Sequence, residues 1–260
     1  MARKGKRGDQ AVPPPLPPET RTVGQLVAET LRLYGRRFWR SLALGFGPAG
    51  LVVGATFIPG WWDLAFVLTV GALLMTLSYV GGVLLAASER PAARTMATAV
   101  VIGYLIFLPV PFLYSVVVLP AVVWLGLIGL AVPAALLERR RLADSIRRGL
   151  ALARADLVHA IGSLATLVIV SFLTATVLFV LLRGGSKIAL SSAAFVSLVF
   201  ISPILFLGAG LLYFDQAARL ESGPRSRRSR DADVHHALDP DRAGRADAEG
   251  KPRPAARGQS

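Results

Sequence analysis

The sequence predicts an all-α membrane protein, a polytopic bundle of six transmembrane helices with two cytoplasmic interfacial amphipathic helices and disordered termini. Two observations predict this fold class. Long stretches contain no Asp, Glu, Lys or Arg, namely Ser41–Trp62, Leu64–Ser88, Thr95–Leu137, Leu157–Leu182 and Ile188–Phe214. The connectors between them are rich in Lys and Arg on alternate sides only. A helix that crosses the hydrocarbon core needs about 20 apolar residues, and it satisfies its own backbone polar groups in lipid.

The chain opens with a basic, proline-rich arm over residues 1–20, and this composition predicts an extended, disordered segment. The proline run Pro13–Pro18 stands where a cleavable signal peptide would have its apolar core. We therefore expect the first span to serve as the insertion signal of the membrane domain, which covers residues 21–221.

Residues 22–40 predict an amphipathic helix that lies on the cytoplasmic membrane surface. Thr22 and Gln25 have the spacing of a capping box, which marks the start of a helix. Apolar and small residues then recur at helical spacing, at Val23, Leu26, Val27, Thr30, Leu31, Tyr34 and Phe38. An apolar stripe opposite a basic face is typical of interfacial helices.

The charge-free stretches predict six spans, over about residues 41–60, 64–87, 97–115, 118–137, 158–182 and 188–213. Thr95–Leu137 supplies two of them, because a single helix of that length would run about 60 Å at 1.5 Å per residue. Proline favours helix ends, so we expect the turn between them within Pro109–Pro120. Gly50 and Gly54 form a small-xxx-small pair, which is predicted to let the first span pack closely against a neighbour.

Residues 141–157 predict a second interfacial helix, just before the fifth span. Its apolar stripe consists of Leu142, Ile146, Leu150, Ala153 and Leu157. The segments 22–40 and 141–157 align weakly with each other, and each leads into a span. An internal duplication and the convergent patterning of two basic helices both account for this similarity.

The distribution of Lys and Arg predicts that both termini are cytoplasmic, because cytoplasmic connectors carry an excess of these residues. The Ala, Arg, Gly, Leu and Val bias points to a bacterial protein, so we expect a bacterial plasma membrane. The net charge of +13 lies mostly in these connectors and tails, so we do not expect specific nucleic-acid binding. The expected partners are the lipid bilayer and its anionic headgroups, contacted by Arg32, Arg36, Arg37, Arg40, Arg140, Arg141, Arg147, Arg148 and Arg154.

The sequence predicts no catalytic residue, metal site or cofactor. Ionisable side chains inside a membrane mark functional pathways, and the predicted spans contain no Asp, Glu, Lys or Arg. His159 lies near the cytoplasmic start of the fifth span, where an interfacial histidine is favoured over a proton relay. Cysteine is absent, so thiolate sites are excluded. Residues 222–260 mix Arg, Asp, Pro and Gly without apolar periodicity, which predicts a disordered tail.

Three segments, at Val23–Gly45, Val132–Leu164 and Leu211–Glu221, resemble the membrane domain associated with glycerophosphoryl diester phosphodiesterases and related six-span bacterial proteins. The resemblance covers roughly Arg21–Glu221. In the phosphodiesterase fusions, catalysis belongs to a separate soluble barrel with acidic and histidine metal ligands. This chain has neither the length nor the ligands for that barrel, so the resemblance implies a membrane module and carries over no catalytic residue.

We therefore expect a non-enzymatic, multi-pass membrane protein that acts as an accessory or interaction module. The alternative is a transporter or permease component for an apolar or lipid-like solute. Pro48, Pro133 and Pro203 lie within predicted spans and are expected to kink them, and broken helices frame the binding sites of many transporters.

Overall fold

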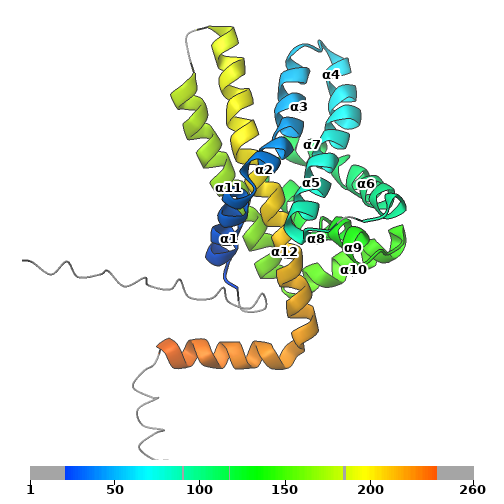
Figure 1. Cartoon of the computed structure of the whole chain (residues 1–260), viewed down its shortest axis with the longest axis vertical. Coiled ribbons are helices and arrows are strands. Elements are labelled where there is room, and N and C mark those ends of the chain that lie inside the picture. Colours follow the sequence, from blue (N-terminus) through cyan, green and yellow to red (C-terminus); the bar gives the residue numbers. More distant parts are fainter. Residues whose placement is uncertain (1–20, 90, 117, 184–185, 239–260) are drawn as a thin grey trace, which may run out of the picture. The chain divides into compact units, whose positions relative to one another are not determined.

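The computed structural model describes residues 21–89, 91–116, 118–183 and 186–238, with the backbone alone at 114–116, 187 and 222–238. All regular elements within these residues are helices (Figure 1). In chain order they are α1 (Val23–Arg36), α2 (Phe38–Leu44), α3 (Phe46–Thr56), α4 (Trp61–Phe66), the π-helical segment η2 (Val67–Gly71), α5 (Ala72–Ala87), α6 (Ala93–Phe107), α7 (Val110–Val116), α8 (Val118–Ile128), α9 (Ala131–Leu137), α10 (Leu142–Ala155), α11 (Leu157–Leu182) and α12 (Lys187–Leu238).

Five helical segments of the described chain are long and apolar enough to cross a membrane, which supports a multi-pass membrane protein. They are Trp61–Ala87, Ala93–Leu113, Val118–Leu137, Leu157–Leu182 and Ile188–Glu221. They coincide with the second to sixth predicted spans. The third and fourth of the predicted spans are separated between Leu113 and Val118, inside the predicted Pro109–Pro120 interval.

The first predicted span, residues 41–60, is not one long helix. It is divided between α2 and α3, which meet at Gly45. A Cβ atom on Gly45 would lie 2.1 Å from the carbonyl oxygen of Val199 in α12, so the backbones of two helices meet here. Pro48 falls in the first turn of α3 and has no N–H to bond to the carbonyl oxygen of Leu44, four residues earlier, so the break before α3 lies where proline is expected to interrupt a helix.

The helix α1 begins as predicted, but its apolar face packs against protein. Thr22 and Gln25 form the full capping box. Leu26 is fully buried in a cluster that also contains Leu152 of α10 and Leu167 of α11. The stability of α1 therefore comes at least in part from helix–helix packing.

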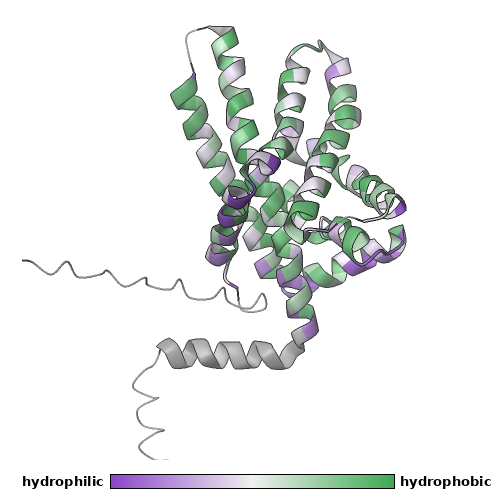
Figure 2. Cartoon of the chain, viewed as in Figure 1, coloured by the Kyte–Doolittle hydropathy of each residue, from purple (hydrophilic) through white to green (hydrophobic). Residues whose placement is uncertain are grey.

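The buried face of α10 overlaps the predicted stripe only in part, because small residues allow a closer approach than leucine does. The buried positions of the helix are Ser145, Gly149, Leu152 and Ala153, whereas Leu142 and Leu157 at the ends of the stripe are about 40% exposed. A Cβ on Gly149 would lie 2.6 Å from the backbone nitrogen of Ala131 in α9. Figure 2 shows hydrophilic residues along α1 and α10 and hydrophobic residues along α3 and α11.

The chain divides into two compact units, Met1–Leu220 and Glu221–Ser260. The first holds all five apolar segments and their core, apart from the last residue of the fifth segment. In the second, α12 continues as far as Leu238, whereas the sequence predicts disorder from residue 222. The remainder of the predicted disordered termini, residues 1–20 and 239–260, lies outside the described residues.

Candidate functional site

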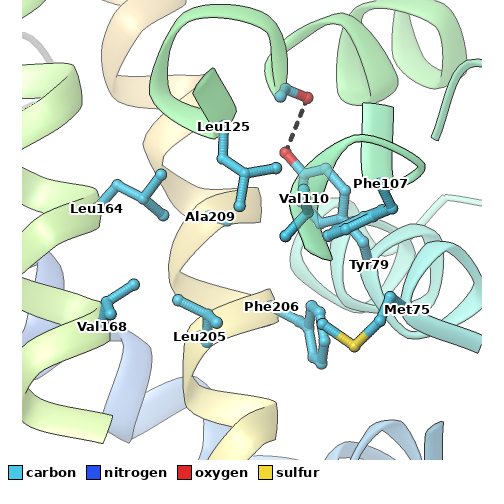
Figure 3. Close-up of a pocket in the computed structure, with 11 residues that line it drawn as sticks. Met75, Tyr79, Phe107, Val110, Leu125, Leu164, Val168, Leu205, Phe206 and Ala209 are labelled. Carbon is cyan, nitrogen blue, oxygen red and sulfur yellow. Dashed lines mark hydrogen bonds between the residues drawn. The ribbon is translucent and has the colours of Figure 1, made fainter. Parts of the chain in front are cut away.

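An apolar cavity of about 90 Å³ lies within the first unit, among α5, α6, α7, α8, α11 and α12 (Figure 3). The side chains of Leu164 and Val168 on α11 face it from one side, and those of Met75 and Tyr79 on α5 from the other. The complete lining is Met75, Tyr79, Phe107, Val110, Leu125, Gly129, Leu164, Val168, Leu205, Phe206 and Ala209.

The one side-chain polar group among these lining residues, the hydroxyl of Tyr79, is engaged by the backbone. It donates a hydrogen bond of 3.1 Å to the carbonyl oxygen of Gly129. Pro133 lies four residues later and has no N–H, so this oxygen accepts from the backbone N–H of Val132, at 3.2 Å, in place of the usual α-helical donor. Tyr79 adds a second hydrogen bond at the turn between α8 and α9, where the backbone borders the cavity.

Two further side chains donate hydrogen bonds to backbone carbonyl groups at a helix end and in the π-helical segment. Trp124 of α8 donates from Nε1 to the carbonyl oxygen of Ile106, in the last turn of α6, at 2.9 Å. Tyr104 of α6 donates to the carbonyl oxygen of Leu68, in the π-helical segment, at 3.3 Å. Carbonyl groups freed at helix breaks need such partners wherever water is excluded.

The lining of the cavity suits an apolar ligand better than it suits water. A buried water molecule needs two to four polar partners, and this lining offers none that is not already engaged. Left empty, a cavity of this size would cost about 2 kcal/mol, at about 24 cal/mol per Å³. An apolar occupant would remove most of that cost.

A cluster of charged and polar side chains lies apart from the cavity, where α10, α11 and α12 meet the start of the described chain. Arg21 donates from Nη1 to Oδ1 of Asp215 at 2.8 Å, and the Asp215 side chain is fully buried. Arg219 donates to Oδ2 of Asp156 at 2.7 Å and to the carbonyl oxygen of Arg21 at 2.7 Å. Asp156 also caps α11 by accepting from the backbone N–H of His159. These bonds fasten the beginning of the membrane domain to its end.

Asp215 and His159 approach each other within this cluster without a hydrogen bond. Their Oδ2 and Nε2 atoms are 3.8 Å apart, and neither atom has a hydrogen-bond partner. A single bridging water molecule or a small movement of the imidazole ring would satisfy both atoms.

Glu138, just after α9, is the centre of a second ionic cluster. Its Oε1 atom accepts hydrogen bonds of 2.8 Å from Arg148 of α10 and from Tyr213 of α12, and its Oε2 atom pairs with Arg140. Burial would raise the pKa of Glu138, but the hydrogen bonds from Arg148, Tyr213 and Arg140 and the positive charge of Arg148 hold it below its ordinary value. The carboxylate therefore ties three helices together in its ionised form.

The arginines that the sequence assigns to anionic lipid headgroups fall into two groups in the structure. One group is exposed and consists of Arg32, Arg36, Arg40, Arg141, Arg147 and Arg154. The other is engaged within the protein. Arg140 and Arg148 pair with Glu138, and Arg37 donates to the carbonyl oxygen of Leu85 and to Oγ of Ser88 at the end of α5. Arg32 also pairs with Glu29, and Arg140 remains exposed, so lipid contact by all nine arginines stays a prediction.

The two glycines of the predicted helix-packing pair have different surroundings in the structure. A Cβ on Gly54 would lie 2.6 Å from Cζ of Phe66 in α4, whereas one on Gly50 would have no heavy atom within 4 Å. In this region Gly45 lies close to the backbone of Val199 in α12. Gly47 likewise lies close to Ser78 and Leu74 of α5. Gly50 makes no such close contact with another helix among the described residues.

The buried pair of Arg21 and Asp215 was not predicted from the sequence, because Asp215 stands one residue beyond the last charge-free stretch. A signal was available, since Asp215 and Arg219 lie four residues apart and so share a helix face. Among the described residues, no group of three or more His, Cys, Asp or Glu is placed to hold a metal ion. No family model, no curated protein and no solved structure matches this chain.

Proposed function

We propose that this chain is a non-enzymatic, membrane-embedded accessory or interaction module. The observation that carries this proposal is the placement of the buried charged side chains. Asp215, Glu138 and Arg219 bond to other residues of the same chain at helix ends, so they fasten helices together. Catalytic acids and bases are instead expected to converge on a cleft that admits substrate.

The proposal includes a location and a topology. The chain resides in a bacterial plasma membrane with both termini in the cytoplasm, as the distribution of Lys and Arg predicts. The kinked pair α2 and α3 forms a sixth span, and α1 and α10 lie at the cytoplasmic surface. Their exposed arginines contact anionic headgroups there. The resemblance to the membrane domain associated with glycerophosphoryl diester phosphodiesterases supports the same assignment.

Crosslinking in native membranes tests the accessory role. We expect the full chain to be recovered with a discrete, stoichiometric protein partner, identified by mass spectrometry. In the test variant Asp215→Asn, loosening of the helix ends is expected to weaken the recovery of the partner. Turnover of a lipid or a phosphodiester by the purified chain, lost on substitution of a single residue, would refute the non-enzymatic assignment.

A second candidate function, movement of an apolar or lipid-like solute, is favoured by the cavity among the broken helices. An apolar solute needs no buried charge, which agrees with the lining. We expect liposomes that contain the chain to move a fluorescent lipid analogue faster than empty liposomes. Equal rates across a panel of lipids and apolar solutes would argue against this function.

A further inference from the structure

The wall of the cavity is formed by residues from two parts of the chain, α5 to α8 and α11 to α12. The side chains that surround it are aliphatic, aromatic or thioether groups, apart from the engaged hydroxyl of Tyr79. Such a wall gains nothing from a charged or hydrogen-bonding ligand, and a narrow, flexible apolar group suits a space of about 90 Å³.

Helix breaks keep the cavity open. Val110 follows the prolyl residue that separates α6 from α7, and Gly129 lies in the turn between α8 and α9. Tyr79 and Trp124 donate hydrogen bonds to the carbonyl oxygens of Gly129 and Ile106, which tie these turns to α5 and α8. The helices change direction beside the cavity and do not close over it.

The cavity is not fully sealed, and its surroundings are apolar. Met75, Val168 and Leu205 of its wall are only half-buried. On α11, Leu173 is 58% exposed, close in sequence to Val168. In a membrane these surfaces face lipid, so the apolar groups present at the highest concentration beside the cavity are hydrocarbon chains.

We propose that this cavity binds a hydrocarbon chain, supplied by a membrane phospholipid or by an isoprenoid lipid. The chain enters from the surrounding lipid and fills the space between α11 and α5, while the polar headgroup stays outside the lining described above. This inference names the ligand class and the site for the second candidate function, and it rests on that function only through the membrane location of the chain.

Photocrosslinking tests the site directly. The full chain is reconstituted in vesicles of phosphatidylglycerol and phosphatidylethanolamine with a trace of phosphatidylglycerol that carries a diazirine in mid-chain. A parallel set carries a diazirine-labelled polyprenyl phosphate. Peptide mapping by mass spectrometry is expected to find adducts on Met75 and Val168 with at least one of the two probes. The probe that labels them identifies the source of the chain.

A matched pair of variants separates the cavity from general lipid contact. Ala209→Phe fills the cavity and is expected to abolish the adducts on Met75 and Val168. Leu173→Phe adds a ring on the exposed side of α11 and is expected to leave them unchanged. Should Ala209→Phe fail to give a monodisperse protein, Leu164→Phe narrows the same space from the opposite wall.

Two outcomes would overturn the inference. Adducts confined to exposed residues such as Leu173 in the wild-type chain would show that no hydrocarbon enters. Adducts on Met75 that persist in a well-folded filled variant would show that they arise elsewhere. Cavity adducts without any lipid movement in the liposome assay would support the binding site while refuting the transport function.

Discussion

At the scale of single residues, the Asp215 carboxylate is the most constrained charge in the described part of the chain. Its side chain is fully buried, and the Arg21 side chain that pairs with it is only 13% exposed. Removing two charges from water is costly, and the pair offsets this cost only while both partners are present. The ion pair therefore stabilises the contact between the start of the membrane domain and its last helix only while both partners are present.

The substitution Asp215→Asn tests the contribution of this ion pair to stability. The substitution leaves Arg21 buried beside a neutral group, and we expect a loss of about 3 kcal/mol in the free energy of unfolding, as for other broken buried pairs. Denaturant titration of the detergent-solubilised chain, followed by circular dichroism, measures the loss. Glu29→Gln is the control, because the pair of Glu29 with Arg32 is surface-exposed and worth at most about 1 kcal/mol. Equal effects of the two substitutions would contradict the assignment.

Glu138 is expected to make stability depend on pH. Its hydrogen bonds from Arg148 and Tyr213 and the ion pair with Arg140 lower the pKa in the folded state below the ordinary value of 4.5. The contribution of Glu138 is thus fully present above about pH 4.5 and is lost as the pH falls through the lowered pKa. In Glu138→Gln this contribution should be missing at neutral pH, and the acid-side loss should be smaller. Midpoints of thermal unfolding from pH 7 to pH 3 measure it, with the exposed Asp144→Asn as control; parallel profiles for wild type and Glu138→Gln would refute it.

At the scale of helices, the junction of α2 and α3 at Gly45 interrupts a segment that the sequence predicts as one span. The Gly45 backbone meets Val199 of α12 so closely that no side chain fits between them. The composition of residues 41–60 is that of a continuous span, but the segment is divided into two helices at Gly45, where Pro48 supplies no N–H for the carbonyl oxygen of Leu44 and the backbone meets α12.

A pair of alanine substitutions tests that account. Gly45→Ala places a Cβ atom 2.1 Å from the carbonyl oxygen of Val199, and we expect a loss of about 2 kcal/mol or more, typical of overpacking. Gly50→Ala meets no heavy atom within 4 Å, so the higher helix propensity of alanine should stabilise α3, by up to about 1 kcal/mol. Denaturant titration of both variants measures the contrast. The opposite order would restore Gly50 as the packing residue.

The same segments show which features of the fold can be predicted from the sequence and which cannot. Apolar length alone predicts the five long helical segments, because burying a charge in lipid is costly and the signal is local. Which glycine makes a contact depends on the partner helix, and α12 is more than 140 residues away from Gly45. The same limit applies to the buried face of α10, which is set by the proximity of Gly149 to Ala131, and to the pairing of Arg21 with Asp215. The cavity depends on the packing of six helices, and no local pattern in the sequence encodes it.

At the scale of the whole molecule, the division of the first predicted span determines the topology. Five crossings would place the two termini on opposite sides of the membrane, and six would place them on the same side. The second unit carries eight Arg and one Lys, and the N-terminal arm carries Arg3, Lys4, Lys6 and Arg7; residues of this kind favour the cytoplasmic side. The charge distribution therefore favours six crossings, with the kinked pair α2 and α3 as the first.

Labelling of single cysteines decides between the two topologies, and the chain suits the method because it has no cysteine of its own. With six crossings, cysteines at Gly8 and Ser260 should be protected from an impermeant maleimide in intact cells, and those at Pro59 and Ser186 should react. A permeant maleimide, which should label all four positions, controls for accessibility. Reaction at Gly8 together with Pro59, while Ser260 stays protected, would show that α2 and α3 do not cross. The basic arm would then lie outside, against the charge rule that governs the other connectors.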